Sequence, residues 1–268
     1  MSCTINSPTV GGLTSTSSVS QLVDADDALT ARLYAHTIYS FPVYYISFDP
    51  KPELEDQIRE RGWKNVHHFP AVPGKSKTAL EWYQEGLLSL RSYVNMKQNN
   101  YYSTDLLPSL GAIGCYLSHL NIWKIAIQQA HPYVIVMEED ILLNRNLYES
   151  ELLKIAEILN QPKSVYLSAP SIHPVLGHFY IARLDACKVM VEHALPIEIQ
   201  VDVYIDFLSI AGLISKTVFL TYSQKFHIST IQKFCLKCIF PSNNGQLFLL
   251  IVLICLIVIV TLKYIKII

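Results

Sequence analysis

Three adjacent carboxylates, Glu138, Glu139 and Asp140, follow an uncharged hydrophobic run at Tyr133 to Met137. In open α/β sheets ligands bind beyond the carboxyl ends of the strands, so acidic residues directly after a strand are candidate ligand contacts. Neighbouring carboxylates repel one another unless a cation or solvent relieves them. Oxygen ligands of this kind suit Mg²⁺ or Mn²⁺, which can also be shared with phosphates. Three solvated carboxylates at the start of a loop would give the same pattern, and both interpretations stay open.

A second group of candidate residues lies on the segment from Gly111 to Ile127. Its apolar side chains fall on one helical stripe, which predicts a helix that begins near Gly111 to Gly114. A helix N-terminus presents free N–H groups that suit phosphate oxygens. Gly114, Ser118 and His119 are therefore candidates for contacting an anionic ligand, although a lone histidine on such a helix is more often part of the core.

The surrounding elements alternate between strands and helices. Strands are expected at 43–48, 66–69, 133–137, 164–168, 179–182 and 218–222, and helices at 52–61, 77–97, 111–127, 149–159 and 185–194. This alternation predicts an α/β fold, with an open, mostly parallel sheet and helices on both faces.

The two ends differ in composition from this central part. Residues 1–20 contain ten Ser or Thr and no charge, so we expect a disordered tail over residues 1–33, without a cleaved signal peptide. Residues 247–262 are sixteen residues without a charge, and the segment 247–268 is long enough to span a bilayer. The sequence therefore predicts a juxtamembrane linker at 233–246 and a single transmembrane helix at 247–268. With no earlier hydrophobic signal, we expect a tail-anchored protein whose domain faces the cytosol from an internal membrane.

Composition excludes some classes of protein. Lys and Arg total 21 and Asp and Glu total 22, and a near-neutral chain does not indicate a nucleic-acid binder. The six cysteines are scattered, which is not the pattern of a disulfide scaffold. Cys115 and Cys187 are predicted to be small core residues. Cys235 and Cys238 form a C-x-x-C pair that lacks a second pair with metal-ligand spacing, so we interpret them as unpaired or lipidated.

In the predicted helix at 111–127 and the acidic strand end at 133–140, the sequence resembles glycosyltransferase family 25. This family includes lipopolysaccharide glycosyltransferases and collagen galactosyltransferases. The resemblance rests on GAIGCYLSHLNIWK at 111–124 and YVIVMEEDILL at 133–143, and it extends over about residues 42–232 through motifs at 178–190, 197–206 and 223–231. It implies a GT-A fold, placed here at residues 34–232, and an inverting transfer of a hexose, galactose or glucose, from a nucleotide-sugar donor. The expected donor is a UDP-sugar, the expected cofactor Mn²⁺ (or Mg²⁺), and the acceptor a hydroxyl of a glycan, a lipid-linked sugar or a protein.

The resemblance also implies roles for individual residues. Asp140 would be the principal metal ligand, and Glu138 would lie near the metal or the donor ribose. Asp202 is the first candidate for the base that deprotonates the acceptor hydroxyl, and Asp206 is the second. Glu139, with Gly114, Ser118 and His119, completes the expected donor-binding set.

Two positions depart from the family pattern and keep a second function class open. Glu139 stands where the family usually has Asp, and the expected opening strand ends in Ser47-Phe48-Asp49-Pro50, without the family's Arg. These departures are compatible with a membrane-tethered binding or scaffold domain that has lost catalysis. A phosphatase-like hydrolase is disfavoured, because no aspartate nucleophile with a downstream lysine is evident.

Overall fold

The structure, a computed structural model, describes residues 33, 35–98, 107–141, 143, 145–168 and 178–219. A six-stranded sheet runs through this part in the order β2-β1-β3-β5-β4-β6. The strands are β1 (Pro42–Ser47), β2 (Asn65–Pro70), β3 (Tyr133–Glu138), β4 (Ser164–Ser168), β5 (Phe179–Arg183) and β6 (Ser215–Phe219). Neighbouring strands are parallel except around β5, which runs antiparallel to both β3 and β4. The predicted α/β class and mostly parallel sheet are confirmed.

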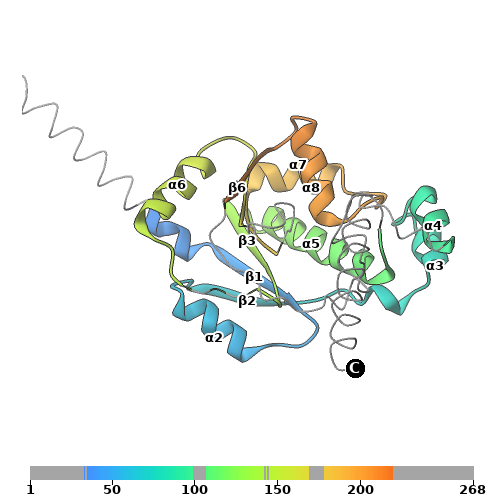
Figure 1. Cartoon of the computed structure of the whole chain (residues 1–268), viewed down its shortest axis with the longest axis horizontal. Coiled ribbons are helices and arrows are strands. Elements are labelled where there is room, and N and C mark those ends of the chain that lie inside the picture. The colour runs from blue at the N-terminus through green and yellow to red at the C-terminus, as the bar shows by residue number, and fades with distance from the viewer. Residues whose placement is uncertain are drawn as a thin grey trace, which may run out of the picture.

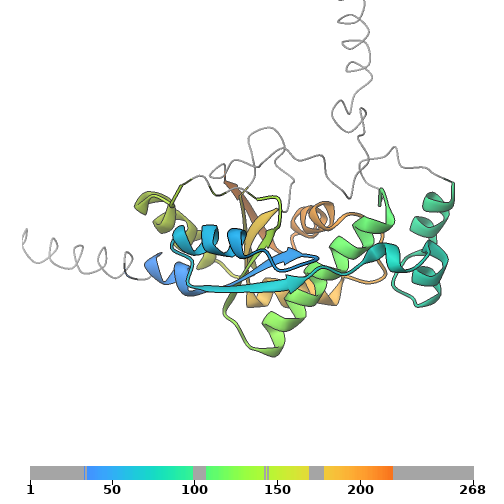
Figure 2. The same cartoon turned by 90° about the horizontal axis from the view of Figure 1, so that it is seen from below.

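Helices cover both faces of this sheet, as predicted. Figure 1 shows α2 (Pro52–Glu60) and α6 (Glu149–Leu159) on one side, and α5 (Leu110–Gln128), α7 (Leu184–Glu192) and α8 (Val201–Ile210) on the other. The short helices α3 (Ala79–Gln84) and α4 (Leu90–Lys97) lie beyond one end of α5. Seen from below, the long α5 crosses the strands at an angle (Figure 2).

The strands separate two hydrophobic cores because successive side chains of a strand point to opposite faces. In β1, Tyr44 and Ile46 face the α5 side, while Val43 and Tyr45 face the α2 and α6 side. The same alternation places Val134 and Val136 of β3 in the first core and Ile135 and Met137 in the second. A strand buried on both faces explains why β1 and β3 are continuous hydrophobic runs in the sequence.

Three secondary-structure elements differ clearly from the predictions. The helix expected at 77–97 is two helices, because the chain turns at Gly86, whose φ of +74° favours glycine. The last strand begins at Ser215 rather than at residue 218, and α8 was not predicted as a helix.

Within the described residues, no helix is long and apolar enough to cross a membrane. The linker and the transmembrane segment predicted at 233–246 and 247–268 lie outside those residues, as does almost all of the predicted tail.

Candidate metal and donor site

The end of β3 and the start of β5 bring together Glu138, Asp140 and His178. The backbone N–H of Glu138 donates to the carbonyl of His178 at 2.9 Å, and the N–H of Ile141 donates to the carbonyl of Glu138 at 3.1 Å. The first bond joins the antiparallel strands at this edge, and the second closes the tight turn after β3. The turn returns Asp140 to the side of Glu138, so three polar side chains meet at the carboxyl end of the central strand.

Within this acidic cluster (Glu138, Asp140 and His178), two buried atoms lack hydrogen-bond partners. His178 Nδ1 lies 2.8 Å from Glu138 Oε2 and 3.2 Å from Asp140 Oδ1. Despite this proximity, neither His178 Nδ1 nor Asp140 Oδ1 makes a hydrogen bond of acceptable geometry. Buried polar atoms are nearly always hydrogen-bonded, so these two atoms are candidates for contacting a ligand or an ordered water. One ligand atom from each residue lies within 4.8 Å of the others, a spacing that fits a metal ion.

Charges within the acidic cluster shift its pKa values in opposite directions. Burial alone would raise the pKa of Glu138, but the charge of His178 and a hydrogen bond from His119 hold that pKa well below its usual range. Burial would lower the pKa of His178, but the negative charge of Glu138 and the neighbouring Asp140 raise it well above its usual range. The side chains of these three residues are 17%, 22% and 18% exposed (Glu138, Asp140, His178), so a ligand from solvent can reach them.

The middle carboxylate of the triplet points elsewhere. Glu139 Oε2 forms an ion pair with Lys51 Nζ at 2.6 Å, between the turn after β3 and the residue before α2. Glu139 is the first residue of the turn after β3, and its side chain leaves the turn toward Lys51 while Asp140 lies beside Glu138. The residue that departs from the family pattern is therefore not one of the three that form the acidic cluster.

His119 is fully buried and orients Glu138 through a chain of hydrogen bonds. Trp123 Nε1–H donates to the Tyr180 hydroxyl at 2.8 Å, and that hydroxyl lies 2.8 Å from His119 Nδ1. The Tyr180 O–H is thereby free to donate to Nδ1, which leaves the proton of a neutral His119 on Nε2. That N–H faces Glu138 Oε1 at 3.3 Å. His119 thus contacts the acidic cluster through Glu138, whose carboxylate it positions.

Two other residues that were predicted to contact the sugar donor, Ser118 and Gly114, instead contact other parts of the protein. The Ser118 hydroxyl donates to the carbonyl of Gly114 at 2.8 Å and accepts from the N–H of Val72 at 2.9 Å, and the residue is fully buried. α5 begins at Leu110, so Gly114 is its fifth residue and not one of the free N–H groups at its start. A Cβ on Gly114 would lie 2.2 Å from the carbonyl oxygen of Val72 and 2.6 Å from the nitrogen of Gly74. The expectation that Ser118 and Gly114 contact an anion is corrected: they hold the segment 72–74 against α5.

The two predicted bases differ in their surroundings. Asp202 lies in the first turn of α8, where one carboxylate oxygen accepts from the N–H of Val203 at 2.8 Å. Burial raises the pKa of Asp202, and the negative charge of Glu138 adds to that rise, which shows that Asp202 lies within electrostatic range of the acidic cluster. Asp206 lies one turn further along and is ion-paired with Lys216 of β6.

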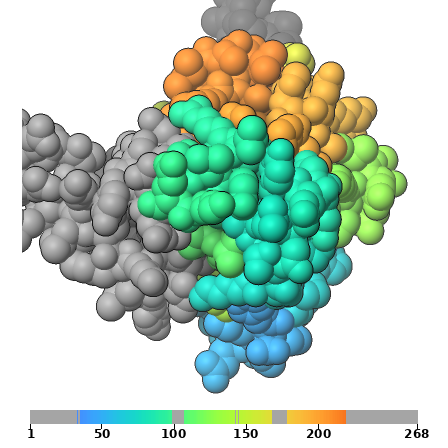
Figure 3. Space-filling view, turned by 90° about the vertical axis from the view of Figure 1, so that its right-hand side faces the viewer, coloured from blue at the N-terminus to red at the C-terminus, as the bar shows by residue number. Residues whose placement is uncertain are grey.

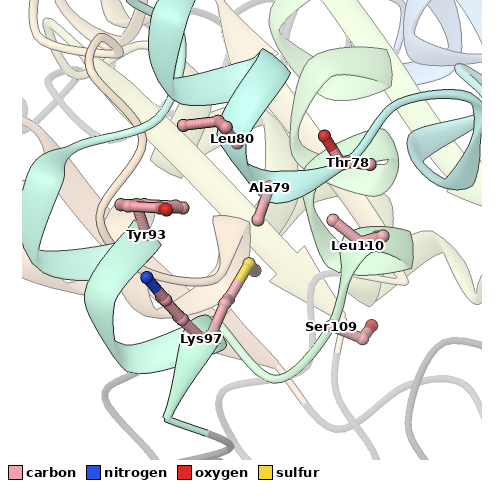
Figure 4. A pocket seen from close by; sticks show the side chains of 8 residues that line it. Thr78, Ala79, Leu80, Tyr93, Lys97, Ser109 and Leu110 are labelled. Carbon is pink, nitrogen blue, oxygen red and sulfur yellow. The ribbon is translucent and has the colours of Figure 1, made fainter.

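A pocket of about 350 Å³ lies apart from these residues, between α3, α4 and the start of α5. Figure 3 shows the face of the molecule that these elements form, coloured teal to green. In the close view, Thr78, Ala79 and Leu80 approach Tyr93 and Lys97 across it (Figure 4). None of its lining residues belongs to the acidic cluster.

The fold places the acidic cluster at the carboxyl end of a central strand, which is where open α/β sheets bind their ligands. Comparison with known families makes this more specific. The model of "Glycosyltransferase family 25 (LPS biosynthesis protein)" matches residues 42–173. Over these residues the chain is therefore similar to glycosyltransferase family 25.

Curated relatives agree with this similarity. The chain is 30% identical over 127 residues to a "Glycosyltransferase 25 family member" from Drosophila pseudoobscura pseudoobscura, which covers 46% of this chain and 18% of the relative. Relatives of the same description from Drosophila melanogaster and Anopheles gambiae are 27% identical over 126 residues and 35% identical over 77 residues. These matches cover 46% and 29% of this chain, and 19% and 12% of the two relatives. The chain thus matches less than a fifth of the length of these relatives.

Sequence reasoning missed two residues of the site. His178 was noted only as the first residue of a family motif, and Tyr180 only within a strand. The signal that could have found His178 is its place immediately before β5. Because β5 runs antiparallel to β3, the start of β5 lies beside the end of β3. Cys115 was expected in the core, whereas it is partly exposed and its thiol donates to Glu138 Oε1 at 3.6 Å. Cys187 is buried as predicted.

Proposed function

We propose that this chain transfers a hexose from a nucleotide-sugar donor, a UDP-sugar in the first instance, to an acceptor hydroxyl. The observation that carries the proposal is the acidic cluster, with unpaired polar atoms on Asp140 and His178, in a chain similar to glycosyltransferase family 25. The family resemblance implies a GT-A fold and an inverting reaction, and both form part of this proposal.

The donor set of the acidic cluster fits a divalent cation. Two carboxylates and one imidazole offer both hard and borderline ligands, a mixture that favours Mn²⁺ over the strictly oxygen-preferring Mg²⁺. Glu138, Asp140 and His178 would hold the ion. When bound, it would neutralise negative charge on a nucleoside diphosphate leaving group.

Side chains of this protein would position the metal ligands and accept the proton of the acceptor hydroxyl. His119 holds Glu138 by a hydrogen bond and leaves Glu138 Oε2 facing His178. We assign the base to Asp202, because its raised pKa favours accepting a proton from an acceptor hydroxyl and it lies near the acidic cluster. Asp206 is the second candidate, although its carboxylate is already paired with Lys216.

The acceptor would be a hydroxyl of a glycan, a lipid-linked sugar or a protein. The hydrophobic segment 247–268 supports a membrane anchor, and a domain that faces the cytosol is part of this proposal. Protease protection of an N-terminal tag in sealed vesicles tests the orientation: digestion of the tag is expected, and a protected tag would overturn it.

A donor screen tests the enzymatic proposal. The full chain is incubated with a panel of nucleotide sugars and Mn²⁺, and transfer or donor hydrolysis is followed by product mass. We expect turnover of at least one donor, abolished by Asp140→Ala and retained by Asp56→Ala, an exposed aspartate of α2. Binding of no nucleotide sugar at all would favour the non-catalytic scaffold instead.

A further inference from the structure

A second group of potential metal ligands lies on the other side of Glu138. Cys115 and His119 are four residues apart on α5 and so project from the same face of the helix. Together with Glu138 they offer a sulfur, a nitrogen and an oxygen that all lie within 4.8 Å of one another. This thiol-containing group uses Glu138 Oε1, whereas the acidic cluster uses Glu138 Oε2.

The distances within this group match those of a tetrahedral zinc site. Cys115 Sγ lies 3.6 Å from Glu138 Oε1, and His119 Nε2 lies 3.3 Å from the same oxygen. With Zn–S bonds near 2.3 Å and Zn–N or Zn–O bonds near 2.0–2.1 Å, two ligands of a tetrahedral zinc lie about 3.3–3.6 Å apart. Two of the three distances between ligand atoms therefore already match a zinc site, and the third, from Cys115 Sγ to His119 Nε2, lies within 4.8 Å.

The surroundings also supply a partner behind the histidine. A metal-bound histidine usually donates its other ring N–H to a fixed acceptor, which sets the ring orientation. His119 Nδ1 lies 2.8 Å from the Tyr180 hydroxyl, which is itself fixed by Trp123. With Nε2 on a metal, the ring proton would lie on Nδ1 and donate a hydrogen bond to the Tyr180 oxygen, whose own O–H would turn away. Burial and Glu138 raise the pKa of the Cys115 thiol, so the cation would have to displace that proton.

We propose that Cys115, His119 and Glu138 form a second metal site that binds Zn²⁺ with an open fourth position. Because the two sites use the two oxygens of one carboxylate, zinc at Glu138 Oε1 repels a second cation at Oε2 and so weakens ion binding by the acidic cluster. The zinc site itself does not depend on the proposed sugar transfer. Only the consequence, inhibition of transfer by Zn²⁺, rests on that function.

Cobalt provides a direct optical test, because a thiolate bound to Co²⁺ gives an intense near-ultraviolet charge-transfer band that carboxylate and imidazole ligands do not give. The full chain is titrated with Co²⁺ in a Cys235→Ser/Cys238→Ser background, which removes the other closely spaced pair of thiols. No sugar donor or Mn²⁺ is present. We expect one equivalent of Co²⁺ to produce the band and Zn²⁺ to abolish it.

Three variants locate the site. Cys115→Ser is expected to remove the band, and Cys187→Ser, at a buried cysteine, to keep it. Asp140→Asn disables only the acidic cluster and is also expected to keep it. A band that survives Cys115→Ser, or no band in the parent protein, overturns the proposal. Circular dichroism confirms that each variant is folded, and Cys115→Ala replaces Cys115→Ser if the serine variant is not.

Failure of this test is distinguishable from failure of the proposed function. A missing cobalt band leaves Mn²⁺-dependent donor turnover unaffected, and missing turnover leaves the band unaffected. If both are present, Zn²⁺ should inhibit transfer in the parent protein and inhibit the Cys115→Ser variant at least about tenfold less strongly. Loss of a mere outer-shell partner already costs about 10–100-fold in metal affinity, and Cys115 is proposed as a direct ligand.

Discussion

Helix α5 has two polar contacts that lie within a few residues of each other and serve opposite purposes. At Ser118 every polar atom is paired: the hydroxyl donates to Gly114 and accepts from Val72. At His119 the helix meets the acidic cluster, where Asp140 Oδ1 and His178 Nδ1 have no hydrogen bond. A paired buried group stabilises the fold, whereas an unpaired one costs free energy unless a ligand satisfies it.

The difference shows why the most recognisable motif residues are not all site residues. Gly114, Ser118 and His119 belong to one motif, yet Gly114 and Ser118 hold the segment 72–74 and only His119 contacts a residue of the acidic cluster. We expect substitutions in the packed contact to reduce stability and substitutions in the acidic cluster to reduce ligand binding.

The largest effect is expected for Gly114→Ala. Its Cβ would overlap the backbone of Val72 and Gly74, at 2.2 Å and 2.6 Å, and backbone atoms on both sides cannot move aside as a flexible side chain can. We expect a loss of about 3 kcal/mol or more in the free energy of unfolding, at the upper end for overpacked sites. Thermal or urea unfolding of the variant measures it.

Gly86→Ala is the matched control for Gly114→Ala. Gly86 has a φ of +74° but no atom within 4 Å of an added Cβ, so only backbone strain of about 1–2 kcal/mol is expected. Equal losses in the two variants would show that the contact between α5 and the segment 72–74 is not tightly packed.

Asp140→Asn is expected to have the opposite profile. Asp140 Oδ1 makes no hydrogen bond of good geometry but lies 3.2 Å from His178 Nδ1, so removing its charge should cost only the free energy of a weak ion pair, about 1 kcal/mol without metal. Affinity for Mn²⁺ should fall by more than the roughly 10–100-fold that loss of an outer-shell partner costs, because Asp140 is a proposed ligand itself.

Calorimetry with Mn²⁺ and unfolding with and without the ion measure both quantities for Asp140→Asn. An ion that binds only the folded protein also stabilises it, so Mn²⁺ should raise the melting temperature of the parent protein but not that of the variant. A strongly destabilised variant without metal would mean that Asp140 is a structural residue.

Ser118→Ala tests the hydrogen-bonded contact between α5 and the segment 72–74 by removing a single hydroxyl. Removing it leaves the N–H of Val72, a half-buried residue, without the partner that it now has at 2.9 Å in the fully buried Ser118. The expected loss is about 1–3 kcal/mol in the free energy of unfolding. Mn²⁺ affinity, measured by calorimetry, should remain that of the parent protein, and a selective loss of Mn²⁺ binding would contradict the separation of the two contacts.

Much of the fold could be predicted from the sequence because each element carries a local signal. The runs of β1 and β3 are hydrophobic on both faces, and α6 was placed at its observed bounds. The helix at 77–97 was predicted as one element because a single glycine, Gly86, carries the turn.

The candidate site was less predictable because it depends on contacts between distant segments. Glu138 and Asp140 follow a strand and were identified directly. His178 joins them only because β5 pairs antiparallel with β3, and no local pattern specifies that pairing. Glu139 likewise points away from the acidic cluster because it pairs with Lys51, which lies nearly ninety residues away in the sequence.

The smallest effect is expected for Glu139→Gln, the variant that separates the sequence-based site from the observed one. Its ion pair with Lys51 is partly exposed, so its loss should cost about 0.2–1 kcal/mol in the free energy of unfolding. Because this carboxylate faces Lys51 rather than His178, Mn²⁺ affinity should change far less than in Asp140→Asn, which calorimetry on the two variants in parallel can establish. Equal losses of Mn²⁺ binding would mean that the ion is held by the consecutive triplet that the sequence suggests, and that His178 is not its third ligand.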